Sequence, residues 1–362
     1  MKKTISNLSI VSLLLINLSI QAASSKTLKW HPGHYIFVSN APLTKQMLTL
    51  PNFRGVQKFY TWRDFEKEKG VYDFSSLKAD LEMMKQYNRQ LVVQLTYKSF
   101  TKGKREIPDY ITGDEYGGGV YTTHKGSLNP VIWNKNVIAR FEALIAAFGK
   151  EFDQYPNLEA VNLPETATSA PLIKSPQVGV EAFTEQNYFK VLKQQMSALR
   201  NALPNTVVIQ YLNFPQSLLD ALTDYAKEIG VGMGGPDVYP REDAVSDPKI
   251  GIYRLYTKLA GTVPMGAAVQ VENYSVAKKK RTKLSRGEGG KDKPIVITAE
   301  DEIPIPVREH LQLAKETLKL NYLFWANTPD LENVKKMLAE PDLVNDPAGG
   351  LITKIPPKAF LK

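Results

Sequence analysis

Two glutamates each follow a short apolar run whose residue types favour a β-strand. Glu165 follows residues 158–162, and Glu272 follows residues 264–271. When parallel strands close into a barrel, the carboxyl groups just beyond them face its mouth. Two such groups can cleave a glycosidic bond, because one protonates the leaving oxygen while the other, ionised, attacks the anomeric carbon. We therefore expect Glu165 and Glu272 to be catalytic.

Eight strand-like runs could position these groups, and amphipathic helical stretches lie between them. The runs are residues 34–40, 56–62, 90–97, 158–162, 206–212, 231–235, 264–271 and 322–326. The helical stretches are residues 74–87, 134–152, 183–203, 216–229, 248–259, 307–320 and 331–338, and only the connection at 41–55 is poorly helical. This alternation predicts an α/β protein with parallel strands and crossover helices.

Eight units in about 300 residues favour a closed (β/α)8 TIM barrel over an open sheet. The alternative, a doubly wound sheet, usually carries a glycine-rich phosphate turn after its first strand, and residues 38–42 contain no glycine. Long loops are expected after strands three, four and seven, at residues 98–133, 166–181 and 275–303. Such loops at the mouth of a barrel suit a cleft for an extended polymer.

Residues 59–74, FYTWRDFEKEKGVYDF, carry a family resemblance. They resemble the strand-two stretch of β-galactosidase-like and cellulase-like members of clan A of the retaining glycoside hydrolases. Residues 130–134 with 153–157, and the strand-eight segment 324–327, are similar to the same clan. Together these segments extend from Tyr60 to Asn327. Strands four and seven are where this clan places its two catalytic glutamates.

The resemblance implies a role for each matching residue. Glu165 would be the acid/base and Glu272 the nucleophile of a two-glutamate retaining mechanism. Tyr239 would hydrogen-bond the nucleophile, Arg63 would support it by an ion pair, and Trp325 would stack on a sugar ring.

Other residues at strand ends could contact a sugar. Aromatic rings would stack on its apolar faces, whereas amides and carboxylates would bind its hydroxyls. The candidates are Trp62, Gln94, Tyr97, Asn162, Asn213 and Asp237. Alternate residues of a barrel strand face inward and outward, so about half of such side chains belong to the core instead. Asp237 is also a rival principal catalytic group.

One position departs from the family pattern. Clan A usually has Asn directly before its acid/base glutamate, but this chain has Pro164 there. Asn162 or Asn213 could replace the missing contact to the sugar 2-hydroxyl, the substrate could differ at C2, or activity could be lost. The last option leaves a non-catalytic carbohydrate-binding barrel of the cell envelope as the alternative function.

Residues 1–23 read as a bacterial signal peptide, with Lys2 and Lys3 before an apolar stretch and small residues at Ala22 and Ala23. A retained membrane anchor is the alternative. We expect cleavage, a periplasmic or secreted protein with no membrane span, and one catalytic barrel over residues 24–362. The absence of cysteine excludes disulfides and thiolate chemistry.

The positive charge is concentrated in one segment. The chain has a net charge of +9, which falls to +7 without the signal, and residues 278–293 carry +6 of it. This segment is either a solvated loop or an attractor for an anionic glycan or envelope. Because the remainder is near neutral, nucleic acid is not an expected partner. We expect a monomer that acts on a poly- or oligosaccharide, with neither cofactor nor metal, since the four histidines lack ligand spacing.

Overall fold

The computed structural model describes residues 29–169, 181–241, 251–277 and 302–356. The signal segment 1–23 and the basic segment 278–293 lie outside these residues. Eight parallel strands form a closed barrel, which confirms the expected fold and excludes the doubly wound sheet. Around the barrel they are β1 (Gly33–Phe37), β2 (Phe53–Thr61), β3 (Gln90–Thr96), β6 (Leu158–Leu163), β7 (Val207–Tyr211), β8 (Gly232–Gly235), β9 (Met265–Val269) and β12 (Tyr322–Ala326).

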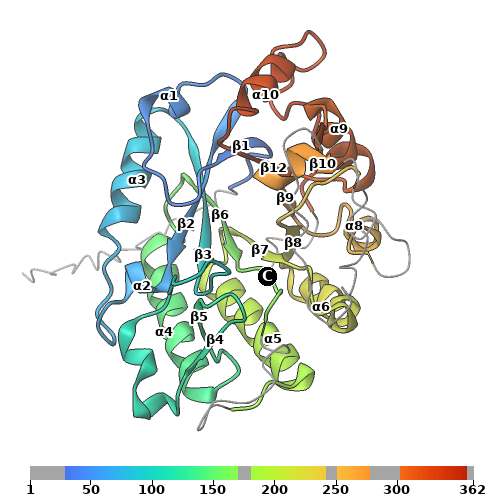
Figure 1. The fold of residues 1–362 in the computed structure, drawn as a ribbon. Helices are drawn as coiled ribbons and strands as arrows, with labels where there is room; N and C mark the ends of the chain where they lie inside the picture. The colour runs from blue at the N-terminus through green and yellow to red at the C-terminus, as the bar shows by residue number, and fades with distance from the viewer. Residues whose placement is uncertain (1–28, 170–180, 242–250, 278–301, 357–362) are drawn as a thin grey trace, which may run out of the picture.

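Helices surround the strands (Figure 1). They are α1 (Lys45–Leu48), α2 (Trp62–Phe65), α3 (Ser75–Gln86), α4 (Lys135–Phe152), α5 (Glu185–Ala202), α6 (Gln216–Ile229), α8 (Tyr253–Leu259), α9 (Val307–Gln312) and α10 (Leu331–Leu338). The connection at 41–55 contains only the four-residue α1, in line with its weak helical pattern. No helix among the described residues combines the length and apolar character that a membrane crossing requires.

Local sequence explains where the longer helices begin. The Asn134 side chain accepts hydrogen bonds from the backbone N–H groups of Asn136 and Val137, which caps α4. Thr184 caps α5 in the same way. In α4, Phe141 and Phe148 belong to one apolar face and are fully buried. The helices thereby dock against the outside of the barrel, and the strands are held in place from both faces.

Two apolar layers result from the alternation along the strands. The layer between strands and helices is the larger core. A smaller cluster fills the inside of the barrel with Tyr35, Val92, Ala160, Val207, Ile209, Tyr211, Ala268, Tyr322 and Phe324. Gly234 in β8 permits this packing, because a Cβ there would lie 2.7 Å from the Tyr211 ring. The barrel is therefore packed at its centre and is not an open pore.

Several short elements lie in the connections between the barrel strands. The β3–α4 connection carries the 3-10 turns η1 (Asp109–Thr112) and η2 (Asp114–Tyr116) and a hairpin of β4 (Val120–Thr122) with β5 (Leu128–Pro130). The 3-10 turn η4 (Val271–Tyr274) follows β9 and leads into β10 (Ser275–Ala277), which pairs with β11 (Glu302–Pro304). The π-helical turn η6 (Leu313–Thr317) continues α9.

Candidate functional site

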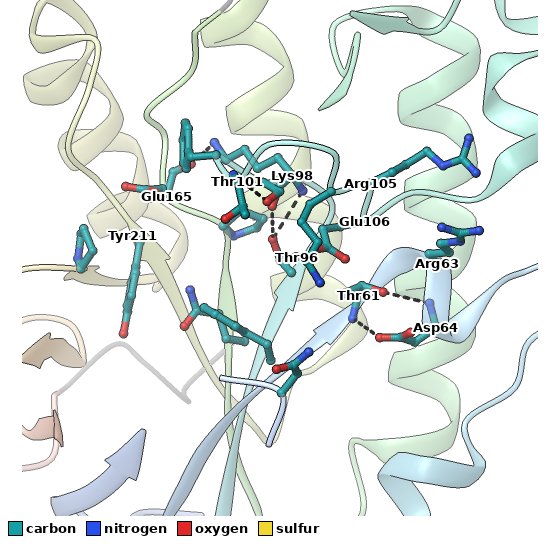
Figure 2. A pocket seen from close by; sticks show the side chains of 18 of the residues that line it. Thr61, Arg63, Asp64, Thr96, Lys98, Thr101, Arg105, Glu106, Glu165 and Tyr211 are labelled. Carbon is teal, nitrogen blue, oxygen red and sulfur yellow. Dashed lines mark hydrogen bonds between the residues drawn. The ribbon is translucent and has the colours of Figure 1, made fainter. Parts of the chain in front are cut away.

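A cavity of about 930 Å³ opens at the carboxyl ends of the barrel strands. Figure 2 shows Glu165, Lys98 and Tyr211 on one side of it and Arg63, Asp64 and Arg105 on the other. Its lining is mostly polar and comprises Asn40, Phe59, Thr61, Arg63, Asp64, Gln94, Thr96, Lys98, Ser99, Phe100, Thr101, Gly103, Lys104, Arg105, Glu106, Pro164, Glu165, Tyr211, Pro236 and Gln270. This is the end of the barrel at which (β/α)8 enzymes carry their sites.

Glu165 lies in this cavity, two residues beyond the end of β6. Burial raises the pKa of its carboxyl above the ordinary value, and the negative charge of Asp237 adds to the increase. The Lys98 cation and a hydrogen bond from the Asn213 amide to Oε2 oppose the shift without reversing it. The carboxyl is therefore biased towards its protonated form, as a proton donor requires.

Asn213, two residues beyond β7, is placed by the turn that carries Glu165. Its Oδ1 accepts a hydrogen bond from the Ala167 N–H at 2.7 Å, while its Nδ2 donates to Glu165 Oε2. The Asn213 N–H in turn donates to the Thr166 hydroxyl at 3.1 Å. The amide thus has a fixed orientation and meets the carboxyl from the neighbouring strand.

Glu272 lies elsewhere. Strand β9 ends at Val269, and Gln270 is the residue that lines the cavity at this strand end. The Gln270 N–H donates to Asn273 Oδ1 at 2.7 Å, which turns the chain into η4. Glu272 is exposed on this turn and is absent from the lining of the cavity. The structure therefore brings Gln270, rather than Glu272, into the cavity with Glu165.

Asp237 and Tyr239 follow β8. Asp237 is partly buried and accepts a hydrogen bond from Asn273 Nδ2 at 3.0 Å. The Tyr239 hydroxyl donates to the Ser275 carbonyl at 2.6 Å, so it holds the chain just beyond η4. Both residues thus contact the segment that carries Glu272.

Three aromatic candidates are buried outside the barrel. Trp62 donates to Glu66 Oε2 at 2.8 Å, Tyr97 to Gln195 Oε1 at 3.1 Å, and Trp325 to His34 Nδ1 at 2.9 Å. All three belong to the layer between strands and helices, and at most 3% of each is exposed. Trp325 sits at an outward position of β12, whereas Trp62 begins α2 and Tyr97 directly follows β3. None has a free face for a sugar, so they do not enter the proposed site.

The remaining candidates lie in or next to the cavity. Gln94 lines it, and Asn162 is buried at the β6 position that pairs with Gln94. Arg63 also lines it, but its ion pair is with Asp109 at 3.2 Å, at the rim rather than beneath Glu272.

Several lining residues were not among the candidates, notably Phe59, Thr61, Thr96 and Glu106. Phe59 and Thr61 share the inward face of β2, and Thr96 follows Gln94 on the inward face of β3. Counting every second residue back from the strand ends would have found these three. Glu106 belongs to an irregular loop, where no periodicity could have indicated it.

In the described ranges, no group of three or more His, Asp or Glu side chains is arranged so that it could hold a metal ion.

Comparisons with known proteins concern the fold. No family model matches the chain, and no curated protein sequence matches it. A thermostable mutant of a xylanase from Cellvibrio japonicus matches with a TM-score of 0.51 and 11% identity, over 86% of this chain and 90% of that one. A β-galactosidase from Marinomonas ef1 matches with a TM-score of 0.50 and 7% identity, over 81% of this chain and 53% of that one.

A third solved structure, the exo-β-1,4-mannosidase Op5Man5 from an Opitutaceae bacterium, has 12% identity and a TM-score of 0.49. This chain spans 60% of the mannosidase and about half of the β-galactosidase. The matches to the xylanase and the β-galactosidase show that the chain shares the barrel fold of solved glycoside hydrolases, as the sequence resemblance implied.

Proposed function

We propose that this protein is an exported glycoside hydrolase that acts on a poly- or oligosaccharide. One observation carries the proposal: a glutamate with a raised pKa follows the fourth barrel strand and faces a polar cavity of about 930 Å³. Pockets for small ligands span roughly 300–1,000 Å³, so this cavity has room for a sugar ligand. The barrel that it shares with a xylanase and a β-galactosidase adds support.

Glu165 would act first as general acid. Asn213 donates to Oε2, which favours the proton on the other oxygen, Oε1. That proton would pass to the glycosidic oxygen as the bond to the anomeric carbon breaks. Gln94, Thr96 and Tyr211 line the cavity near Glu165 and can exchange hydrogen bonds with sugar hydroxyls.

In the retaining mechanism, Glu272 would attack the anomeric carbon and form a glycosyl-enzyme intermediate. Glu165, now ionised, would take a proton from the water that hydrolyses it. This role requires the exposed Glu272 side chain to turn inward past Gln270, to about 5–5.5 Å from Glu165.

Asp237 competes with Glu272 for the role of second carboxylate. It is partly buried, it is held by Asn273, and its charge acts on the Glu165 carboxyl. A 2-deoxy-2-fluoro glycosyl fluoride distinguishes the two, because it leaves a covalent sugar on a competent nucleophile. Peptide mass spectrometry of labelled protein should find the sugar on Glu272, and a sugar on Asp237 would reassign the role.

A non-catalytic carbohydrate-binding barrel is the second candidate function. It is favoured by the position of Glu272, because only one of the two expected glutamates lines the cavity. A panel of plant, bacterial and acidic glycans separates the two functions. The hydrolase should release reducing ends from at least one glycan, and this release should disappear in Glu165→Gln. Binding in calorimetry without release or labelling would establish the binding protein instead.

A further inference from the structure

We propose that Lys98 is a positioning residue that fixes the turn bearing Glu165 and sets the pH range in which this carboxyl gives up its proton. The inference rests on the proposed role of Glu165. Lys98 lies two residues beyond β3, lines the cavity, and is only 9% exposed. A buried lysine needs partners for its ammonium group, and the choice of partners here is informative.

The Lys98 ammonium binds backbone rather than a carboxylate. Nζ donates to the carbonyl oxygens of both Glu165 and Ala167, the second at 2.6 Å. The intervening Thr166 carbonyl accepts from the Tyr188 hydroxyl of α5 at 2.7 Å. Three successive carbonyls are thereby held by side chains from two other elements.

The opposite flank of the turn is held by β7. The Thr166 N–H donates to the Tyr211 carbonyl at 3.0 Å, and Asn213 Oδ1 accepts a hydrogen bond from the Ala167 N–H. Because β6 lies between β3 and β7 in the barrel, Lys98 and Asn213 approach the turn from its two neighbouring strands. The backbone of Glu165 is therefore tied on both sides while its carboxyl faces the cavity.

The charge of Lys98 also acts on this carboxyl. Burial lowers the pKa of Lys98 to about 8, and the Glu165 carboxylate counteracts that decrease. Conversely, the cation lowers the Glu165 pKa, against burial and the charge of Asp237. Among the described residues, Lys98 has no carboxylate within ion-pair distance. No described carboxylate in direct contact therefore neutralises the Lys98 charge before it acts on Glu165.

Substitutions separate the charge from the hydrogen bonds. Lys98→Met removes both with little change in shape, whereas Lys98→Arg keeps the charge and the donors. Lys102→Met is the matched control, since Lys102 is an exposed lysine of the same loop that does not line the cavity. The Glu165 carboxyl is followed by NMR in protein labelled with 13C-glutamate, and its signal is assigned by its loss in Glu165→Gln.

In Lys98→Met, the Glu165 titration should move to higher pH, while Lys98→Arg and Lys102→Met should leave it near the wild-type position. The alkaline limb of kcat/KM should move by the same amount. The value of kcat should fall by about tenfold to a hundredfold, because the turn loses both hydrogen bonds from Lys98. An unchanged Glu165 titration in folded Lys98→Met would overturn the proposal and leave Lys98 a purely structural lysine.

If Lys98→Met does not fold, the reciprocal experiment still tests the coupling between Lys98 and Glu165. Coupling between two groups is mutual, so Glu165→Gln should lower the titration midpoint of Lys98, observed in protein labelled with 13C-lysine. An unmoved Lys98 midpoint would also overturn the proposal. Neither titration needs a substrate, so a protein without glycosidase activity would refute the proposed function while the coupling could still be measured.

Discussion

Strand β6 carries a glutamate at each of its two ends, and the two have opposite surroundings. Glu159, near the amino end, is fully buried, and its carboxylate accepts from the His31 N–H at 2.6 Å, His31 Nδ1 at 2.7 Å and the Tyr322 hydroxyl at 2.7 Å. Glu165, beyond the carboxyl end, has one side-chain donor among the described residues, Asn213, and it lines the cavity. The fully hydrogen-bonded carboxylate and the one that faces the cavity are thus only six positions apart in the chain.

This difference separates a structural role at the amino end of β6 from a proposed catalytic role at its carboxyl end. A buried carboxylate with several hydrogen-bond donors ties structural elements together. Glu159 joins β6 to β12 and to the segment before β1 in this way. A buried carboxyl with few hydrogen-bond donors has a raised pKa and holds its proton more tightly. Its ionised form destabilises the folded protein, and its protonated form can act as a proton donor. The same Glu→Gln change at each end should therefore have opposite consequences.

Glu165→Gln should give the largest effect. Loss of a general acid lowers turnover by about 10²–10⁴-fold, while the fold should persist because the amide is the neutral isostere of the protonated carboxyl. Turnover is measured on the glycan that the wild type cleaves, and folding is measured by thermal denaturation. Near-normal turnover in this variant would remove Glu165 from the mechanism.

Glu159→Gln should affect stability instead. Hydrogen bonds to a charged group contribute about 1.5–3 kcal/mol each, and the amide weakens those from His31 and Tyr322. We expect the free energy of unfolding in urea to fall by about that amount, with kcat/KM unchanged for the folded fraction. A variant that is stable but inactive would contradict the division between the two ends.

Asn213→Ala makes Glu165 still less paired. Because the Asn213 amide lowers the Glu165 pKa, its removal should raise that pKa and move the alkaline limb of the rate profile upward. A loss of about tenfold in kcat/KM at neutral pH is expected from poorer orientation. An alkaline limb that moves downward would show that the amide acts in another way.

The smallest effect is on the pH dependence of stability. Glu165 has a higher pKa in the folded chain than its ordinary value of 4.5, so the folded state binds its proton more tightly. The stabilisation is complete below pH 4.5 and is lost as the pH rises through the folded pKa. Compared with Glu165→Gln, the wild type should therefore lose stability over this range. Parallel curves of unfolding free energy against pH would contradict the raised pKa.

Periodicity predicts the barrel well but places side chains less reliably. All eight expected strands occur, because apolar β-branched runs and amphipathic helices have distinct periods. Trp62 and Trp325 are expected at the mouth as strand-end aromatics, yet Trp62 begins α2, Trp325 occupies an outward position of β12, and both are buried. A strand end alone does not specify the face, and the parity of the whole strand is needed.

Two local irregularities lie beyond what periodicity can predict. The register of β3 with β6 shifts between Leu91 and Val92, which is where Glu159 enters the strand. At β9, the Gln270–Asn273 turn ends the alternation one residue after Val269, so the expected strand to residue 271 is too long and Glu272 leaves the inward face. Both depend on hydrogen bonds that form only in the folded chain.

The dependence of kcat/KM on the leaving group tests most directly whether Glu165 is the proton donor. The 2,4-dinitrophenolate of a dinitrophenyl glycoside leaves without being protonated. The alcohol of a methyl or other alkyl glycoside can leave only when its oxygen is protonated. We compare kcat/KM on the two glycosides for the wild type and Glu165→Gln. Both glycosides carry the sugar of the glycan that the protein cleaves in the panel. We predict a loss of about 10²–10⁴-fold on the alkyl glycoside and little loss on the dinitrophenyl glycoside. Equal losses on both substrates would contradict the assignment of Glu165 as general acid.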